Sequence, residues 1–208
     1  MMEYDFEPIR GLPEDLPADE YVVWQGAPDW RLFARTALYT RWVAGYFLAL
    51  GAFALVSGSI GGAIATGLAG VAAIGLLALF AVLVAKTTVY TITNKRIVFR
   101  IGIALNKCIN LPLKVIGAAD LRAHGAGFGD IAVSLTAAHR LGYAVFWPHV
   151  RPFHFREPQP MLRALLEAEQ VARLLAQSCA TVAPHQAGEV LRDRGSSASP
   201  DGLTEAHV

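Results

Sequence analysis

The sequence predicts an α+β membrane protein: a two-helix transmembrane hairpin joined to a small antiparallel β-sandwich or barrel, closed by a C-terminal α-helix. Three observations predict it: a long uncharged run, a series of short β-prone segments after it, and an amphipathic segment near the C-terminus. We expect an N-terminal cytoplasmic segment with a short strand at 1–31, the transmembrane hairpin at 32–86, a cytoplasmic sheet domain at 87–180 and a disordered tail at 181–208.

The uncharged run covers residues 42–85, which include no Asp, Glu, Lys or Arg. Because one membrane span requires about 20 apolar residues, the run is roughly two spans long. Residues 58–62, Gly-Ser-Ile-Gly-Gly, lie in its middle and allow the chain to turn. We place the first span at 43–57 with the turn or two before it, and the second at 63–85. A buried hairpin in a soluble protein is the weaker alternative, because neither half has an amphipathic polar stripe.

The second half of the run is rich in small residues. Ala65, Ala69 and Ala73 recur every four residues, with Gly67 and Gly70 beside them. In lipid, such spacing lets two helix backbones approach closely. Two compatible interpretations stay open: the two spans pack on each other, or they also dock onto another membrane protein.

Basic residues flank the run on both sides, whereas the turn between the spans carries no charge. They are Arg31, Arg35 and Arg41 before it, and Lys86, Lys95, Arg96 and Arg100 after it. Positive flanks stay on the cytoplasmic side of a membrane, so we expect a multi-pass protein with both termini in the cytoplasm.

Composition agrees with a small membrane protein, since 54% of the 208 residues are hydrophobic and 17% are charged. The net charge of +1 gives no reason to expect nucleic acid as a partner. Cys108 and Cys179 lie far apart without metal-ligand spacing, so we expect two free thiols.

The predicted sheet is built from short segments with β-branched and aromatic residues. A run at 20–24 precedes the hairpin, and whether it joins the sheet or is only a lead-in stays open. Strands are expected at 87–93 and 96–101, joined by a tight turn at Asn94-Lys95, and then at 103–111 and 118–122. The segment 130–135 alternates like a strand with one solvated face, and 142–147 is expected to be its hairpin partner.

Prolines at 158 and 160 introduce a predicted helix from Met161 to Cys179. Its apolar face consists of Leu162, Leu165, Leu166, Val171, Leu174 and Leu175. We expect Leu166 and Leu174 to be buried against the sheet. A helix that closes one end of a strongly bent antiparallel sheet is the layout of a pleckstrin-homology (PH) domain.

Residues 89–102, Val-Tyr-Thr-Ile-Thr-Asn-Lys-Arg-Ile-Val-Phe-Arg-Ile-Gly, resemble the signature of bacterial membrane-anchored PH-like domains. Three further stretches narrow the resemblance: 20–30, Glu-Tyr-Val-Val-Trp-Gln-Gly-Ala-Pro-Asp-Trp; 127–132, Gly-Phe-Gly-Asp-Ile-Ala; and 147–152, Trp-Pro-His-Val-Arg-Pro. Together they resemble the PuhB family, photosynthetic-complex assembly proteins of purple bacteria. The resemblance implies a protein of the bacterial inner (intracytoplasmic) membrane that helps to build the photosynthetic reaction centre and core light-harvesting complex.

Catalytic and metal-binding patterns are not evident in the residues. None of the six histidines lies in the uncharged run, and His149 and His154 have only Glu157 nearby as a further ligand. Residues 125–129, Gly-Ala-Gly-Phe-Gly, lack the spacing of a dinucleotide loop. We therefore expect no enzyme activity, no metal and no cofactor.

The loop 147–155 is the candidate partner-binding surface. Its prolines exclude a central strand, so we expect a rigid, exposed loop that presents Trp147, His149, Arg151 and Phe153. The alternative is that Trp147 belongs to the core and the prolines only end a strand.

Four basic residues, Arg31, Arg35, Lys95 and Arg96, are candidates for contact with anionic lipid headgroups. The preferred function is a non-enzymatic assembly factor that binds reaction-centre and core-antenna membrane subunits. The alternatives are a lipid-binding or generic membrane-anchored PH-like module and, more weakly, a pigment-delivery protein. Association of the chain with itself as a homodimer stays open.

Overall fold

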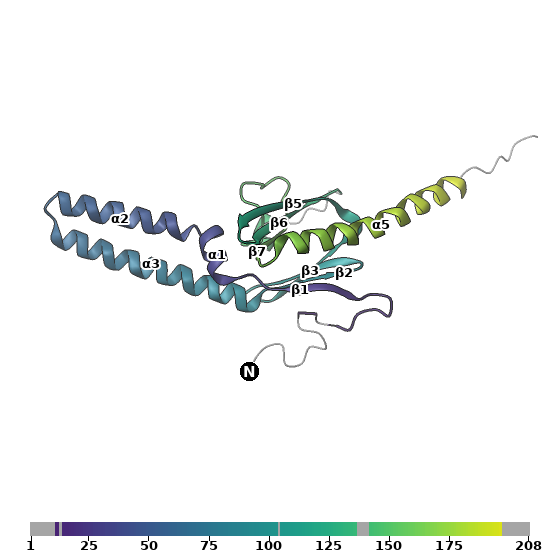
Figure 1. The fold of residues 1–208 in the computed structure, drawn as a ribbon, viewed down its shortest axis with the longest axis horizontal. Helices are drawn as coiled ribbons and strands as arrows, with labels where there is room; N and C mark the ends of the chain where they lie inside the picture. Colours follow the sequence, from purple (N-terminus) through teal and green to yellow (C-terminus); the bar gives the residue numbers. More distant parts are fainter. Residues whose placement is uncertain (1–10, 13, 104, 137–141, 197–208) are drawn as a thin grey trace, which may run out of the picture.

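A computed structural model describes residues 11–12, 14–103, 105–136 and 142–196, with side chains up to residue 182. The elements are β1 (Val22–Gly26), α1 (Trp30–Thr36), α2 (Thr40–Val56), α3 (Ile60–Thr87), β2 (Val89–Thr93), β3 (Arg96–Ile101), β4 (Lys107–Pro112), η1 (Leu113–Val115), β5 (Ile116–Gly125), β6 (Phe128–Leu135), α4 (Tyr143–Phe146), β7 (Met161–Leu165) and α5 (Ala168–Ser196). Figure 1 shows the α2–α3 hairpin extending from one end of a domain of two sheets, with α5 extending from the other end.

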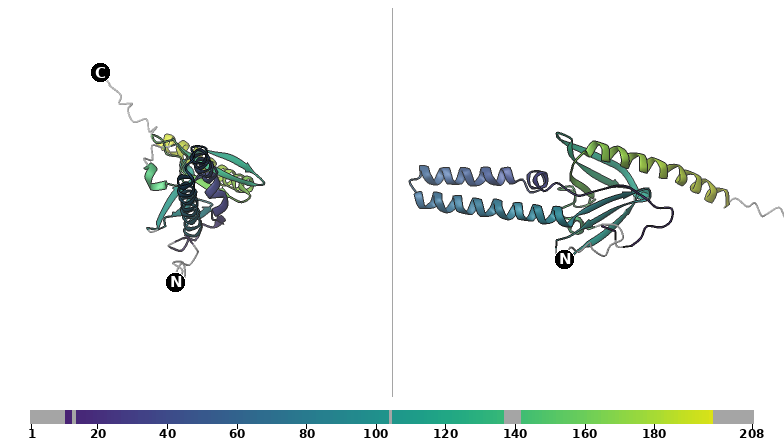
Figure 2. Two further views of the ribbon diagram at one scale, coloured as in Figure 1. Left: turned by 90° about the vertical axis from the view of Figure 1, so that its left-hand side faces the viewer. Right: turned by 60° about the horizontal axis from the view of Figure 1, so that its bottom comes forward.

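The two apolar helices lie side by side, close to the positions that the sequence predicts (Figures 1 and 2). Gly58, with φ of 77°, makes the turn between them, and the Ser59 hydroxyl caps α3 by accepting from the Gly62 amide. Within the described residues, α3 is long and apolar enough to cross a membrane, and α1 with α2 passes the same criteria as one broken span bent by 58°.

The two helices approach each other closely at Gly70. A Cβ atom added there would lie 2.9 Å from the Cβ of Phe47 on α2, so only glycine allows this contact. Ala65 and Ala69, by contrast, are exposed, and Ala73 is half-buried. The predicted row of alanines therefore does not form the interhelical contact as a unit.

The first sheet has the antiparallel order β1-β2-β3-β4. β1 pairs with β2, from Val22 opposite Thr93 to Gly26 opposite Tyr90, so the strand before the hairpin belongs to the sheet. The Asn94 side chain accepts from the backbone amide of Tyr21 and thereby joins the β2–β3 turn to the chain just before β1.

The second sheet, in the order β5-β6-β7, corrects two predictions. Residues 161–165 form strand β7 and not the start of a helix, because β6 pairs with them, Ile131 opposite Leu162. Residues 143–146 form the short helix α4 instead of a hairpin partner for β6. Since β5 and β7 occupy both edges of β6, residues 142–147 have no free edge of β6 to pair with.

The C-terminal helix α5 packs on the core through Val171 and Leu175, which are buried. The expectations for its leucines are only partly met: Leu166 is 55% exposed in the turn before the helix, and Leu174 is half-buried. The helix continues to Ser196, so the predicted disordered tail is helical over 181–196, while 197–208 lie outside the described residues.

A second apolar cluster joins the hairpin to the sheets. Phe33 and Ala34 of α1 pack with Ala81 and Val84 of α3 and with Ala164 of β7. The Asp29 amide also donates to the Ala164 carbonyl over 2.8 Å. The base of the hairpin is therefore packed against the sheet domain and not merely tethered to it.

Candidate functional site

The connection between α4 and β7 presents three exposed aromatic side chains close to the base of α3. Trp147 is 55% exposed, Phe153 85% and Phe155 64%. The Trp147 ring lies beside Phe80 of α3, with 5.7 Å between ring centroids, and Phe155 lies beside Tyr143 of α4. We call Trp147, Phe153 and Phe155 the aromatic loop.

His149 lies in the same connection but points inward, and this corrects the expectation that it is an exposed anchor. It is 1% exposed and its ring lies 5.8 Å from that of Phe33. Its Nδ1 atom is 2.6 Å from the Tyr90 hydroxyl, and its Nε2 atom is 3.3 Å from the Thr88 hydroxyl. Both ring nitrogens therefore have partners at the start of β2.

The hydrogen-bond directions around Tyr90 indicate which ring nitrogen of His149 carries the proton. The Arg163 backbone amide donates to the Tyr90 hydroxyl over 3.3 Å, so that hydroxyl can donate its own proton to His149 Nδ1. The proton of a neutral imidazole is then on Nε2, facing Thr88. Burial, with a smaller contribution from positively charged Arg163, lowers the pKa of His149 to about 3, so the ring is neutral at physiological pH.

A buried carboxylate continues this polar network into the second sheet. Asp130 of β6 accepts from the Ala164 amide over 2.7 Å through Oδ1, and its Oδ2 lies 2.9 Å from His124 Nε2. The Arg163 guanidinium donates from Nη2 to the Val150 carbonyl over 2.9 Å. These contacts connect β2, β5, β6, β7 and the loop after α4, and so fix the position of the aromatic loop.

Arg151 makes contacts that also hold this loop. Its Nη1 atom donates to Asp120 of β5 and to the side-chain oxygen of Gln159, each over 3.0 Å. Arg151 is therefore engaged within the protein, with part of its side chain exposed. Of the four predicted anchors, Trp147 and Phe153 are open for contact, Arg151 is partly so and His149 is enclosed.

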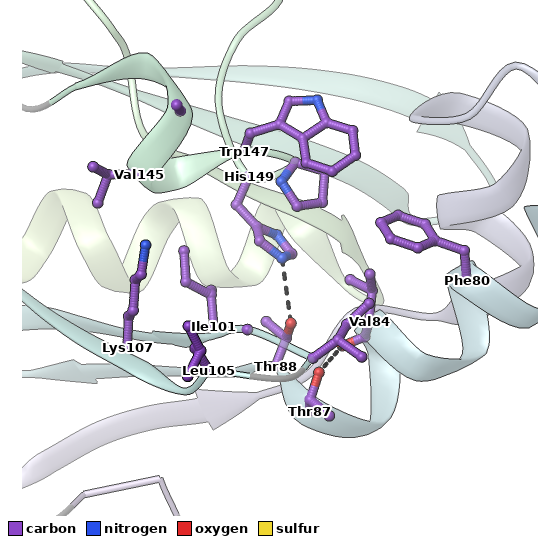
Figure 3. A pocket seen from close by; sticks show the side chains of 14 residues that line it. Phe80, Val84, Thr87, Thr88, Ile101, Leu105, Lys107, Val145, Trp147 and His149 are labelled. Carbon is purple, nitrogen blue, oxygen red and sulfur yellow. Dashed lines mark hydrogen bonds between the residues drawn. The ribbon is translucent and has the colours of Figure 1, made fainter.

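An apolar pocket of about 220 Å³ lies between the base of α3, the end of β3 and the α4 connection. Phe80, Val84, Ile101, Val145 and Trp147 are among its lining residues, and Figure 3 shows how their side chains surround the space. The His149 ring lies at one wall, bonded to Thr88, and Lys107 brings a positive charge to another. The pocket could take an apolar side chain or an acyl chain segment.

The basic residues predicted to contact lipid separate into two groups. Arg31 and Arg35 lie with Arg41 around a hollow of about 730 Å³ between α1, the start of α2 and the β5–β6 turn. Lys95 and Arg96 lie instead at the β2–β3 turn, where they pair with Asp19 and Glu20. At about 3.3 Å per residue, this turn is roughly 20 Å from the end of α3. The four residues therefore lie at two separate places of the fold, and their contact with headgroups stays a prediction.

Sequence reasoning did not assign two parts of the site. The sequence indicates Arg41 only as a basic flank of the first span, although its position after Arg31 and Arg35 and directly before the uncharged run is a usable signal. The contact of His149 with Tyr90 has no local signal in the sequence, because 59 residues separate the partners.

Among the described residues, no group of three or more His, Cys, Asp or Glu side chains is placed to hold a metal ion.

Comparison with known proteins shows a family and a relative of this chain. The profile of the bacterial PH domain family matches residues 43–178, more than half of the chain. A protein of Rhodobacter capsulatus, named as an uncharacterized 23.7 kDa protein in the puhA 5' region, is 41% identical over 186 residues, which cover 85% of this chain and 87% of that protein.

Proposed function

The chain belongs to the bacterial PH domain family, and from that premise we propose a non-enzymatic assembly factor for the photosynthetic reaction centre and core light-harvesting complex. In this proposal the α2–α3 hairpin crosses the inner (intracytoplasmic) membrane, with both termini in the cytoplasm. The protein acts by binding newly inserted membrane subunits before they enter the complex.

The observation that carries the proposal is the apolar surface of the hairpin. No residue of α2 is buried, and only Gly70, Ala81 and Val84 are buried in α3. Contiguous apolar surface of this extent requires lipid or another protein to cover it. At 1.5 Å per residue, the 28 residues of α3 extend about 42 Å, enough to cross a hydrocarbon core of about 30 Å.

The link to photosynthesis has two supports. The stretches at 20–30, 89–102, 127–132 and 147–152 resemble those of PuhB proteins. The relative in Rhodobacter capsulatus is named from its place in the puhA 5' region, a location that agrees with a function in the same process.

The outward face of α3 is the proposed docking surface for a client helix. Gly61, Ala72 and Gly75 are exposed there, and a Cβ atom added at Gly61 or Gly75 would meet no atom within 4 Å. Small residues on a lipid-facing surface let a second helix approach closely. The aromatic loop lies beside the base of α3 and could contact the cytoplasmic end of the same client.

The basic hollow favours a second candidate, a lipid-binding PH-like module without a photosynthetic client. The two candidates differ in what loss of the protein does. A strain without the gene should contain less assembled reaction centre and core antenna, measured by near-infrared absorption of its membranes, while bacteriochlorophyll synthesis continues. Wild-type complex levels in that strain would contradict the assembly function.

A pair of matched glycine variants tests the docking surface. Gly75→Leu adds bulk to the outward face of α3, whereas Gly45→Leu adds the same bulk to an exposed site on α2, where a Cβ atom also meets nothing within 4 Å. Both proteins should accumulate normally in the membrane. Only Gly75→Leu should reduce complex yield and the recovery of client subunits with the tagged protein. Equal yields from the two variants would exclude this face of α3.

A further inference from the structure

Three arginines converge on one hollow at the base of the hairpin. Arg31 and Arg35 are four residues apart on α1, and Arg41 is the second residue of α2. They line a space of about 730 Å³ together with His124, Gly125 and Phe128 from the β5–β6 turn (Figure 1 shows α1 near this end of the second sheet). The bend of 58° between α1 and α2 brings the arginines of the two helices to the same place.

The positive charge of the hollow is not neutralised by the protein. Within the described residues, no carboxylate forms an ion pair with Arg31, Arg35 or Arg41, although Arg31 stacks on Trp30. Asp29 is the one acidic residue of the lining, and its Oδ1 atom accepts from the Leu32 amide. His124 already faces Asp130. Three guanidinium groups against one carboxylate leave an excess of positive charge around the space.

The surroundings place the hollow at the depth of lipid headgroups. Trp30, Tyr39 and Trp42 are exposed within a few residues of the arginines, and aromatic side chains of this kind gather at the membrane–water interface. Beyond Trp42, α2 carries no charged residue and no buried residue. Guanidinium groups bind phosphate oxygens through paired hydrogen bonds, and this suits several of them to one phosphate.

We propose that this hollow binds the phosphate group of an anionic phospholipid from the cytoplasmic leaflet, held by Arg31, Arg35 and Arg41. The assignment rests on the proposed placement of α2 and α3 in the membrane, but it does not depend on any photosynthetic client. A lipid bound there would fix the depth and the tilt of the hairpin relative to the sheet domain, because α1 packs against both.

The test uses the full-length protein in an uncharged detergent. It is titrated with dihexanoyl phosphatidylglycerol, with zwitterionic dihexanoyl phosphatidylcholine and with inorganic phosphate, and tryptophan fluorescence reports binding near Trp30 and Trp42. We expect saturable binding of phosphatidylglycerol and at least tenfold weaker binding of the other two probes. Equal affinity for inorganic phosphate would overturn the lipid assignment, and so would equal affinity for phosphatidylcholine.

Charge-matched variants identify the site. Replacing Arg35 and Arg41 by Gln should weaken phosphatidylglycerol binding about 25-fold, since each basic residue near an anionic surface contributes about fivefold. Lys95 and Arg173 are both exposed and lie away from α1. Replacing these two by Gln removes the same charge and should leave the affinity for phosphatidylglycerol within twofold of the wild type. An equal loss in both variants would show diffuse attraction and overturn the site.

Two further measurements complete the test. If the Arg35, Arg41 double variant unfolds at a lower temperature than the wild type, the single variant Arg41→Gln is tested in its place. Arg41 is exposed at the start of α2. Its replacement should still weaken phosphatidylglycerol binding about fivefold. A polyglutamate peptide that displaces phosphatidylglycerol and binds more tightly would assign the hollow to an acidic protein segment and overturn the lipid. The complex yield of a gene-deletion strain does not enter these outcomes, so the two proposals can fail separately.

Discussion

Lowering the pH should destabilise the sheet domain through His149, and replacing His149 by Gln should remove this contribution. Burial lowers the pKa of His149 from 6.5 to about 3, so the folded protein keeps the ring neutral at pH values where the unfolded chain binds a proton. The stability that neutral His149 contributes is therefore fully present above pH 6.5. It decreases as the pH falls from 6.5 toward 3.

The expected loss of stability follows from this pH window between 6.5 and about 3. Each pH unit well inside it changes the free energy of unfolding by up to about 1.4 kcal/mol. Lowering the pH from 7.5 to 5 should therefore cost about 2 kcal/mol through this one group. Glutamine can accept from the Tyr90 hydroxyl and donate to Thr88 as His149 does, but it does not titrate.

The assay is thermal unfolding of the full-length protein in uncharged detergent between pH 4.5 and 7.5, followed by tryptophan fluorescence. The other ionisable groups of the network are common to both proteins, so their effects largely cancel in the difference; they are Tyr90, Asp130, His124 and Arg163. His154→Gln is the control, because His154 is partly exposed and its Nδ1 faces only the Pro152 carbonyl. An identical pH slope in the wild type and His149→Gln would refute the reasoning.

Three further predictions test the fold and the topology. Leu175→Ala removes a fully buried side chain and should cost about 2–5 kcal/mol of unfolding free energy, whereas Leu166→Ala, 55% exposed, should cost less than about 1 kcal/mol; urea unfolding of the two variants compares them. Gly70→Leu should force α2 away from α3 at Phe47 and increase protease cleavage of the hairpin, so unchanged resistance would contradict the close packing. A reporter that is active only outside the cytoplasm, fused after Val208, should stay silent, since strong activity would contradict cytoplasmic termini.

The hairpin and the β2–β3 pair were predictable because their signals are local. An uncharged run with glycines in its middle specifies two apolar helices whatever surrounds them, and the structure has α2 and α3 close to the predicted bounds. Likewise, the β-branched and aromatic residues on both sides of Asn94-Lys95 specify a hairpin through adjacent segments.

Where the sequence misled, a distant partner decided the local structure. Residues 161–165 have apolar residues that suit a helix, yet they form β7 because β6, about 30 residues earlier in the chain, offers an unpaired edge. Residues 143–146 look like a strand, but both edges of β6 are occupied, and Phe146 is buried against Phe99 instead.

The sequence alone determined the class of the protein: an apolar hairpin, a PH-like antiparallel sheet domain and a closing helix, each encoded by a period or a composition within one segment. Only the tertiary structure decided that Arg31, Arg35 and Arg41 share one hollow while Lys95 and Arg96 lie at the far turn, and that His149 is enclosed by Tyr90 and Thr88. The physical reason is that whether a charged or polar side chain is exposed or enclosed depends on which remote groups can satisfy it.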